Sequence, residues 1–185
     1  MTDMLALRLA GSIALYRLGR LPEADTAAAA VEAEADRDVA MRAAFLRGLI
    51  ADENDDVVGL RRASAQLAAA QAPEGLADQS ELAARIALRE RDPRRARAEA
   101  ERAAVLRRDL LDYRALARCL ALAARAAEEV GDSAVAADLY LRAGRSAAGQ
   151  GEKTSSQKWL SRAIALSSDA TLTSAARAAL AGSDK

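Results

Sequence analysis

The sequence predicts an all-α protein of about ten helices, stacked as antiparallel helical hairpins in an α-solenoid. Three observations lead to this prediction. Alanine supplies 50 of the 185 residues, aromatic residues supply only 3%, and glycine, proline or aspartate turns recur along the whole chain. Alanine loses no side-chain entropy on entering a helix, and the β-branched residues are too few to build a sheet.

The turn signals divide the chain into segments that are long enough for three to five helical turns each. Helices are predicted over residues 3–18, 22–35, 38–51, 56–71, 77–90, 93–107, 111–130, 133–149, 153–167 and 170–181. The links between them are short and contain the residues that cap helices, which favours antiparallel neighbours. A length of 185 residues with 51% apolar content suits one domain, 1–185. The segment 170–181 is short and polar, as expected of a capping helix.

The seventh predicted helix shows the clearest division into two faces. One stripe holds Leu116, Leu120, Ala123, Ala127 and Val130, which follow the spacing of a single helix face. Arg114, Arg118 and Arg125 lie nearly opposite that stripe. This basic face is either a solvated surface or a surface that meets a partner.

The residues needed for most enzyme chemistry are missing. The chain has no histidine and a single cysteine, Cys119, so imidazole bases and zinc sites are excluded. Cys119 is interpreted as a small, partly buried residue rather than a reactive thiol, and Asp52–Asp56 as a polar turn with a helix cap rather than a calcium loop. Trp159, the only tryptophan, is expected to pack between helices, with partner anchoring as the alternative. We therefore expect no enzymatic activity, no metal and no cofactor.

Charge is balanced overall but divided along the chain. Residues 1–75 contain 8 basic and 12 acidic residues, a net −4, whereas residues 76–185 contain 19 basic and 15 acidic residues, a net +4. A total of zero argues against tight nonspecific binding to nucleic acid. No segment is long and apolar enough to span a membrane, and no secretory signal is evident. The expected location is cytoplasmic, or periplasmic or exported if a signal was trimmed.

A turn followed by small or apolar residues at constant offsets occurs four times. The positions are Ala24, Ala28 and Val31; Ala96, Ala100 and Ala103; Ala136, Tyr140 and Ala143; and Ser156, Leu160 and Ala163. Small pairs precede each turn at Gly11-Ser12, Ala83-Ala84, Ala123-Ala124 and Ala143-Gly144. Two antiparallel helices approach closely only where neither carries a bulky side chain, so these positions are predicted to lie at helix crossings.

These offsets resemble the tetratricopeptide repeat, a helix-turn-helix unit of about 34 residues. The tryptophan and tyrosine of that family's first helix are mostly replaced, as by Ser80, Leu120 or Arg8, and its closing proline is absent throughout. The turns at Gly131 and Gly151 are only 20 residues apart. The helix between them would then be the second helix of one unit and the first of the next. Another array of helical hairpins, or a closed bundle, is the alternative fold.

The resemblance implies a protein-interaction or scaffold module that holds a partner peptide or protein on its concave face. In the family register, Arg85, Leu88 and Arg89 of the fifth helix and Arg118, Ala121 and Arg125 of the seventh would project there. Because 24 of the 27 basic residues are arginine, an acidic partner is expected. The alternatives are self-assembly through the oppositely charged halves and, least favoured, a domain with a buried small ligand.

Overall fold

The computed structural model describes residues 2–183 and shows ten α-helices and no strand within them. The predicted all-α class and the ten predicted helices are confirmed. The chain divides into two compact units, residues 1–82 and 83–185, which we call the first and second units and describe separately. The sequence alone predicts one domain and does not reveal this division.

The first unit contains α1 (Thr2–Arg17), α2 (Leu21–Glu34), α3 (Arg37–Glu53) and α4 (Val57–Gln66). Each of these helices packs against the next, and α1 also touches α3. Their core joins Leu9, Val31, Leu46 and Ile50 with the small residues Ala24, Ala28 and Ala43. Helix α5 (Pro73–Arg89) crosses from the first unit into the second.

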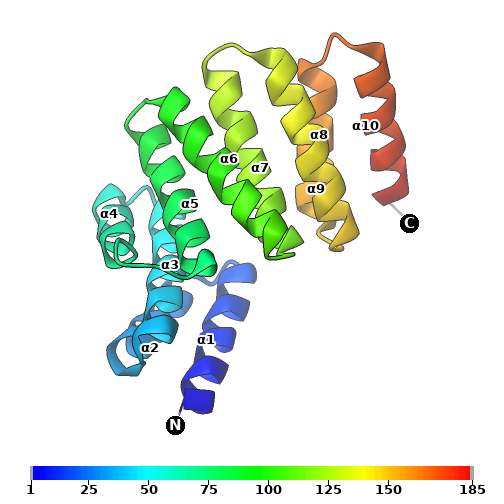
Figure 1. The fold of residues 1–185 in the computed structure, drawn as a ribbon. Coiled ribbons are helices and arrows are strands. Elements are labelled where there is room, and N and C mark those ends of the chain that lie inside the picture. Colours follow the sequence, from blue (N-terminus) through cyan, green and yellow to red (C-terminus); the bar gives the residue numbers. More distant parts are fainter. Residues whose placement is uncertain (1, 184–185) are drawn as a thin grey trace. The chain divides into compact units, whose positions relative to one another are not determined.

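The second unit contains the end of α5 and the helices α6 (Pro93–Asp109), α7 (Tyr113–Glu129), α8 (Ser133–Gly149), α9 (Lys153–Leu166) and α10 (Ala170–Ser183). In Figure 1, α6 to α9 run side by side with alternating direction. Helix α10 packs on α9 and also contacts α8. The core is rich in alanine and includes Cys119, which is fully buried and not partly buried as predicted, because α7 is enclosed at that position by its neighbours.

The same turn joins helices in both units. In each turn, the residue directly before the N-cap of the next helix has a positive φ. These residues are Gly19, Asp55, Arg91, Leu111, Gly131 and Gly151. In every case the following N–H donates to the carbonyl five residues earlier, as Asp112 N does to Arg107 O at 2.9 Å. This is the hydrogen bond that closes a helix whose last turn ends in the left-handed conformation.

An aspartate directly precedes six of the helices that the structure describes. The side chain of Asp92 accepts from the N–H of Arg95, and Asp36, Asp56, Asp112 and Asp132 make the same bond three residues ahead. Such a bond satisfies one of the N–H groups that a helix leaves unpaired at its start. The prediction that the end of Asp52–Asp56 caps a helix is therefore confirmed, because Asp56 caps α4.

The turns of the second unit recur with a strict spacing. Arg91, Leu111, Gly131 and Gly151 lie 20 residues apart, and α6, α7 and α8 each contain 17 residues. The alanines at 103, 123, 143 and 163 share this spacing, and all four have no exposed surface. The structural period is thus a single helix, which explains why α8 closes one helix pair and opens the next.

Most positions predicted to lie at helix crossings are buried, and one of the small pairs lies at a close contact between two helices. All twelve positions of the four turn-led patterns are buried, and the most exposed of them, Tyr140, retains only 9% of its surface. A methyl group added at Gly144 would lie 2.6 Å from Leu160 Cγ, so α8 and α9 meet closely there. Gly11 departs from the pattern because it is exposed with open space beside it.

Two predicted boundaries and one stripe position are wrong. Helix α4 ends at Gln66, not at residue 71, and α5 begins at Pro73, not at residue 77. Arg37 Nη2 donates to Ala69 O at 2.8 Å and binds a carbonyl of the segment after α4. Val130 is 44% exposed and lies outside the buried stripe of α7, because it is the C-cap residue of that helix.

Candidate partner-binding site

A pocket of about 590 Å³ lies on the second unit, bounded mainly by α7 and α9. Its volume is within the usual range of ligand pockets. Its lining consists of Arg85, Arg118, Ala121, Leu122, Arg125, Tyr140, Lys158, Trp159, Ser161, Arg162 and Ala165. One of these residues comes from α5 and one from α8, so four helices contribute to a single surface.

The wall from α7 is basic at both ends and apolar between them. Arg118, Ala121, Leu122 and Arg125 are spaced i, i+3, i+4 and i+7, so they share one helix face. Ala121 and Leu122 retain 8% and 9% of their surface. The core stripe on the other side of α7 holds the helix in this orientation, since Ala123 and Ala127 are fully buried.

The wall from α9 repeats this spacing with different side chains. Lys158, Ser161, Arg162 and Ala165 lie 40 residues after Arg118, Ala121, Leu122 and Arg125, which is two of the 20-residue periods. Lys158, Ser161, Arg162 and Ala165 are all exposed. Trp159 packs partly against the second unit's core, as predicted for a residue between helices, and it also lines the pocket.

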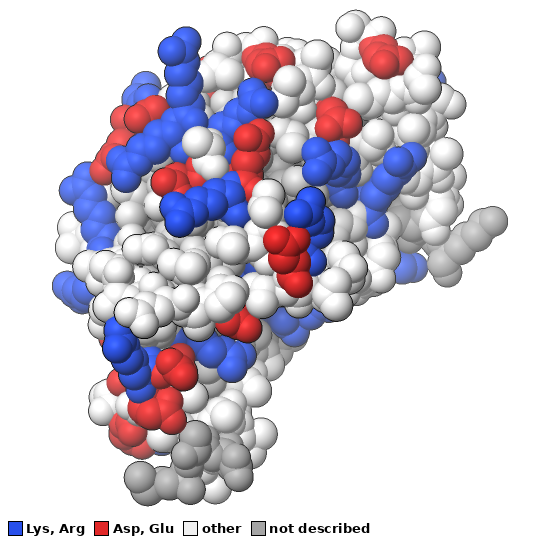
Figure 2. Space-filling model, in the orientation of Figure 1, with Lys and Arg blue, Asp and Glu red and all other residues white. Residues whose placement is uncertain are grey.

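The lining carries five basic side chains and no acidic one. Figure 2 shows a different pattern on the face it presents, where basic and acidic side chains lie intermixed over much of the surface. Arg125 and Arg162 lie beside acidic residues at the end of α7. Arg125 Nε lies 3.2 Å from Glu129 Oε1, and Arg162 pairs with Glu128. The side chains of Arg125 and Arg162 are about half exposed, and ion pairs between exposed side chains are weak. An incoming anion can therefore compete for both guanidinium groups.

Tyr140 connects the pocket to this acidic pair. Its hydroxyl lies 3.5 Å from Glu128 Oε2, the carboxylate that also accepts hydrogen bonds from Arg162. Burial raises the pKa of Tyr140 above its ordinary value, and the charge of Arg125 opposes part of that rise. Tyr140 therefore stays a neutral phenol at physiological pH.

Four of the six residues predicted to contact a partner meet at this pocket: Arg85, Arg118, Ala121 and Arg125. The other two do not line it. Leu88 is 6% exposed and belongs to the core of the second unit, and Arg89 is half-buried. Of the α9 residues, the sequence offers Trp159 as an alternative partner anchor but does not single out Lys158, Ser161, Arg162 and Ala165. The 40-residue offset from α7 was the signal that would have found them.

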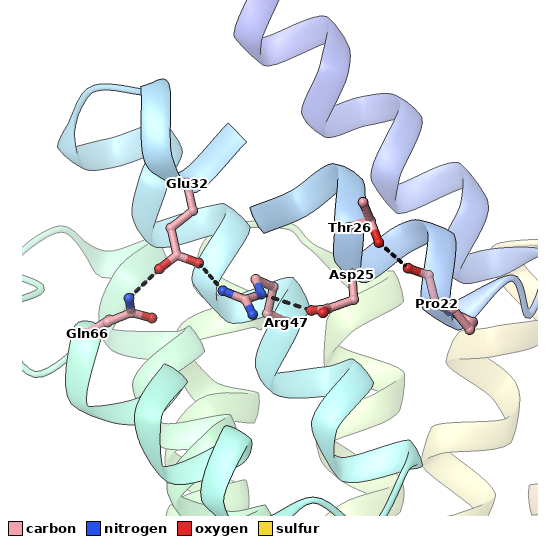
Figure 3. A network of polar contacts seen from close by, with 6 residues as sticks. All are labelled: Pro22, Asp25, Thr26, Glu32, Arg47 and Gln66. Carbon is pink, nitrogen blue, oxygen red and sulfur yellow. Dashed lines mark hydrogen bonds and ion pairs between the residues drawn. The ribbon is translucent and has the colours of Figure 1, made fainter. Parts of the chain in front are cut away.

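The first unit has a smaller pocket of about 280 Å³ between α2, α3 and α4. Figure 3 shows the polar network beside it, centred on Arg47. Arg47 donates to Asp25 at 2.8 Å and to Glu32 at 3.0 Å, and Gln66 donates to the other oxygen of Glu32. The hydrogen bond to Asp25 is the main cause of the raised pKa of Arg47. Because these charges are already paired, we interpret the network as a cross-link between helices.

Residues 2–183 contain no group of three or more Cys, Asp and Glu side chains that is placed to hold a metal ion. None of the helices in that part of the chain has the length and hydropathy needed to span a bilayer. No family model, curated protein or solved structure matches this chain.

Proposed function

We propose that this protein is a non-enzymatic interaction module whose second unit binds an acidic segment of a partner protein in the pocket between α7 and α9. One observation carries the proposal: the pocket has five basic lining residues, two aromatic ones and no acidic one. The resemblance to the tetratricopeptide repeat supports the same class of function, because helical arrays of that kind bind peptides on the face formed by alternate helices.

The kind of basic residue favours carboxylates as the ligand groups. Four of the five basic residues of the lining are arginines, and each guanidinium presents a planar set of donors that matches a carboxylate. Nucleic acid is a poorer candidate, because the whole chain has a net charge of zero and much of the charged surface in Figure 2 is of mixed sign.

The proposal is tested by reversing charge inside and outside the pocket. The variant Arg118→Glu with Arg125→Glu changes two lining residues of α7. The matched control, Arg142→Glu with Arg145→Glu, makes the same charge change at two exposed residues of α8 that do not line the pocket. Partners captured by affinity purification should be lost with the pocket variant and kept with the control. Identical partners and affinities for wild type and both variants would remove the assignment.

Thermal unfolding separates lost binding from lost folding in this experiment. The pocket variant must unfold at a temperature close to that of the control before its partner list is interpreted. If the double variant is unstable, Lys158→Glu provides a second test, because Lys158 is exposed on α9 and lines the same pocket.

A second candidate function is self-assembly, and the division of charge between the units favours it. The first unit has 8 basic and 14 acidic residues, a net −6, and the second has 19 basic and 13 acidic residues, a net +6. Opposite charges of this size promote association between copies at low ionic strength. Light scattering should then show oligomers at low salt that dissociate at high salt. A monomer at both salt concentrations would exclude this candidate.

A further inference from the structure

We infer that the acidic segment bound by the pocket carries a large apolar side chain, preferably aromatic, between two carboxylates. This inference rests on the proposed function and specifies the partner further. It follows from the way charge and apolar surface alternate along α7 and α9, which a purely electrostatic site would not need.

The α7 wall sets the distance between the two carboxylates. Arg118 and Arg125 are seven residues apart, and a rise of about 1.5 Å per residue separates their backbones by about 10 Å along the helix. Ala121 and Leu122 lie between them on the same face and offer no hydrogen-bonding group to a ligand. A ligand that spans both arginines therefore places its middle against apolar surface.

The α9 wall supplies the aromatic surface. Trp159 is partly buried in the core and also lines the pocket, so part of its ring is fixed and part faces the ligand. Its neighbour Lys158 and the next-turn residue Arg162 are exposed basic residues of the same wall. An aromatic ring that enters between the walls would meet the indole in the offset or edge-to-face arrangement that aromatic pairs prefer.

The length of the ligand follows from the same spacing. An extended peptide advances about 3.1 Å per residue in the polyproline II conformation, and residues three apart point in the same direction. Two acidic residues at positions i and i+3 would therefore be about 9 Å apart, close to the spacing of Arg118 and Arg125. A residue between them is near the apolar centre of the pocket.

The ion pairs and the buried apolar side chain contribute differently to the affinity of the peptide, and this difference can be measured. Exposed ion pairs contribute little each and weaken with salt, whereas the burial of a large apolar side chain does not depend on ionic strength in this way. We therefore expect an acidic peptide with the apolar residue to bind at least about tenfold more tightly than one without it, which corresponds to about 1.4 kcal/mol.

The test compares three peptides of equal length with the full-length protein. Their central residues are Glu-Phe-Ala-Glu, Glu-Ser-Ala-Glu and Gln-Phe-Ala-Gln, within identical neutral flanks. Calorimetry measures the dissociation constants. Fluorescence reports binding at the pocket itself, because Trp159 is the only tryptophan of the chain and lines it.

The expected result is that Glu-Phe-Ala-Glu binds most tightly and changes the emission of Trp159. Equal affinities for the two acidic peptides would overturn this inference and leave the proposed function standing. If neither acidic peptide binds at about 1 mM, or if Gln-Phe-Ala-Gln binds as tightly as Glu-Phe-Ala-Glu, the proposed function itself is overturned.

Two variants of the protein test whether the peptides bind in the pocket. Trp159→Ala should bring the affinities for the two acidic peptides close together, measured by calorimetry. Because Trp159 also packs against the core, the second variant is Ala165→Glu, which changes an exposed lining residue and spares the core. Ala165→Glu should weaken Glu-Phe-Ala-Glu at least about tenfold, because its carboxylate repels the ligand, and an unchanged affinity would overturn the proposed function together with the inference that rests on it.

Discussion

Individual small residues determine how closely the helices approach each other. Ala103, Ala123, Ala143 and Ala163 occupy equivalent places in successive helices and have no exposed surface. A larger side chain at any of them would separate two helices, since protein interiors are close-packed. Gly144 is the tightest case in the second unit, because even one methyl group would approach Leu160.

Gly144→Ala should lower the free energy of unfolding by about 1–3 kcal/mol, because the added methyl group overpacks the contact between α8 and α9. Gly149→Ala is the matched control on the same helix, where an added methyl group meets nothing within 4 Å. It should raise the stability by about 0.4–1 kcal/mol, because alanine restricts the unfolded chain. Urea denaturation measures both, and equal stability of the two variants would show that the helices can separate there at no cost.

Tyr140 gives a pH dependence with a definite sign. Burial raises its pKa in the folded protein, so the unfolded phenol ionises first, near pH 10. The contribution to stability is complete below that pH and is lost as the pH rises through the folded-state pKa. Wild type should therefore lose more unfolding free energy than Tyr140→Phe as the pH increases above about 10. Parallel stability curves for the two proteins over that range would refute the assignment.

At the scale of the element, the same type of turn, with one residue of positive φ, joins successive helices at six places in the described part of the chain. Leu111 and Arg91 adopt the positive φ that Gly131 adopts elsewhere, which shows that the cap and not glycine itself defines the turn. Asp92 is a simple example, since its carboxylate accepts from Arg95 N at 3.1 Å. These local bonds end one helix and begin the next within three residues.

Asp92→Ala should cost about 1 kcal/mol of unfolding free energy, because an N–H group at the start of α6 loses its acceptor. Asp92→Asn is the control, since the amide oxygen still accepts that bond and asparagine is as favourable an N-cap as aspartate. Thermal and urea denaturation of the three proteins give the comparison. A loss that is equal for both variants would mean that the negative charge, not the capping bond, is what matters.

The sequence contains most of the information about the helices and less about the site. Turn residues and small-residue offsets predict ten helices, because caps and close crossings are local requirements. The end of α4 is not predictable in this way, since Arg37 binds Ala69 O from another helix. Similarly, Arg118 and Arg125 are identifiable on a polar face, whereas Lys158 and Arg162 join the site because α7 and α9 both pack against α8, and in the sequence only their 40-residue offset from α7 indicates this.

At the scale of the whole molecule, charge is divided into a first unit of net −6 and a second unit of net +6. The acidic first unit contains paired charges around Arg47, as Figure 3 shows. The basic second unit contains the pocket that we propose to be the binding site. The central claim is therefore that an acidic partner lies between α7 and α9 and not on another face of the second unit.

Site-specific photo-crosslinking tests that claim most directly. A photoreactive residue replaces Ser161, which is exposed and lines the pocket, or Arg145, which is exposed on α8 and does not line it. After irradiation with the Glu-Phe-Ala-Glu peptide, we predict a crosslinked product at position 161 and none at position 145. Equal yields at the two positions, or a product at position 145 alone, would contradict the account.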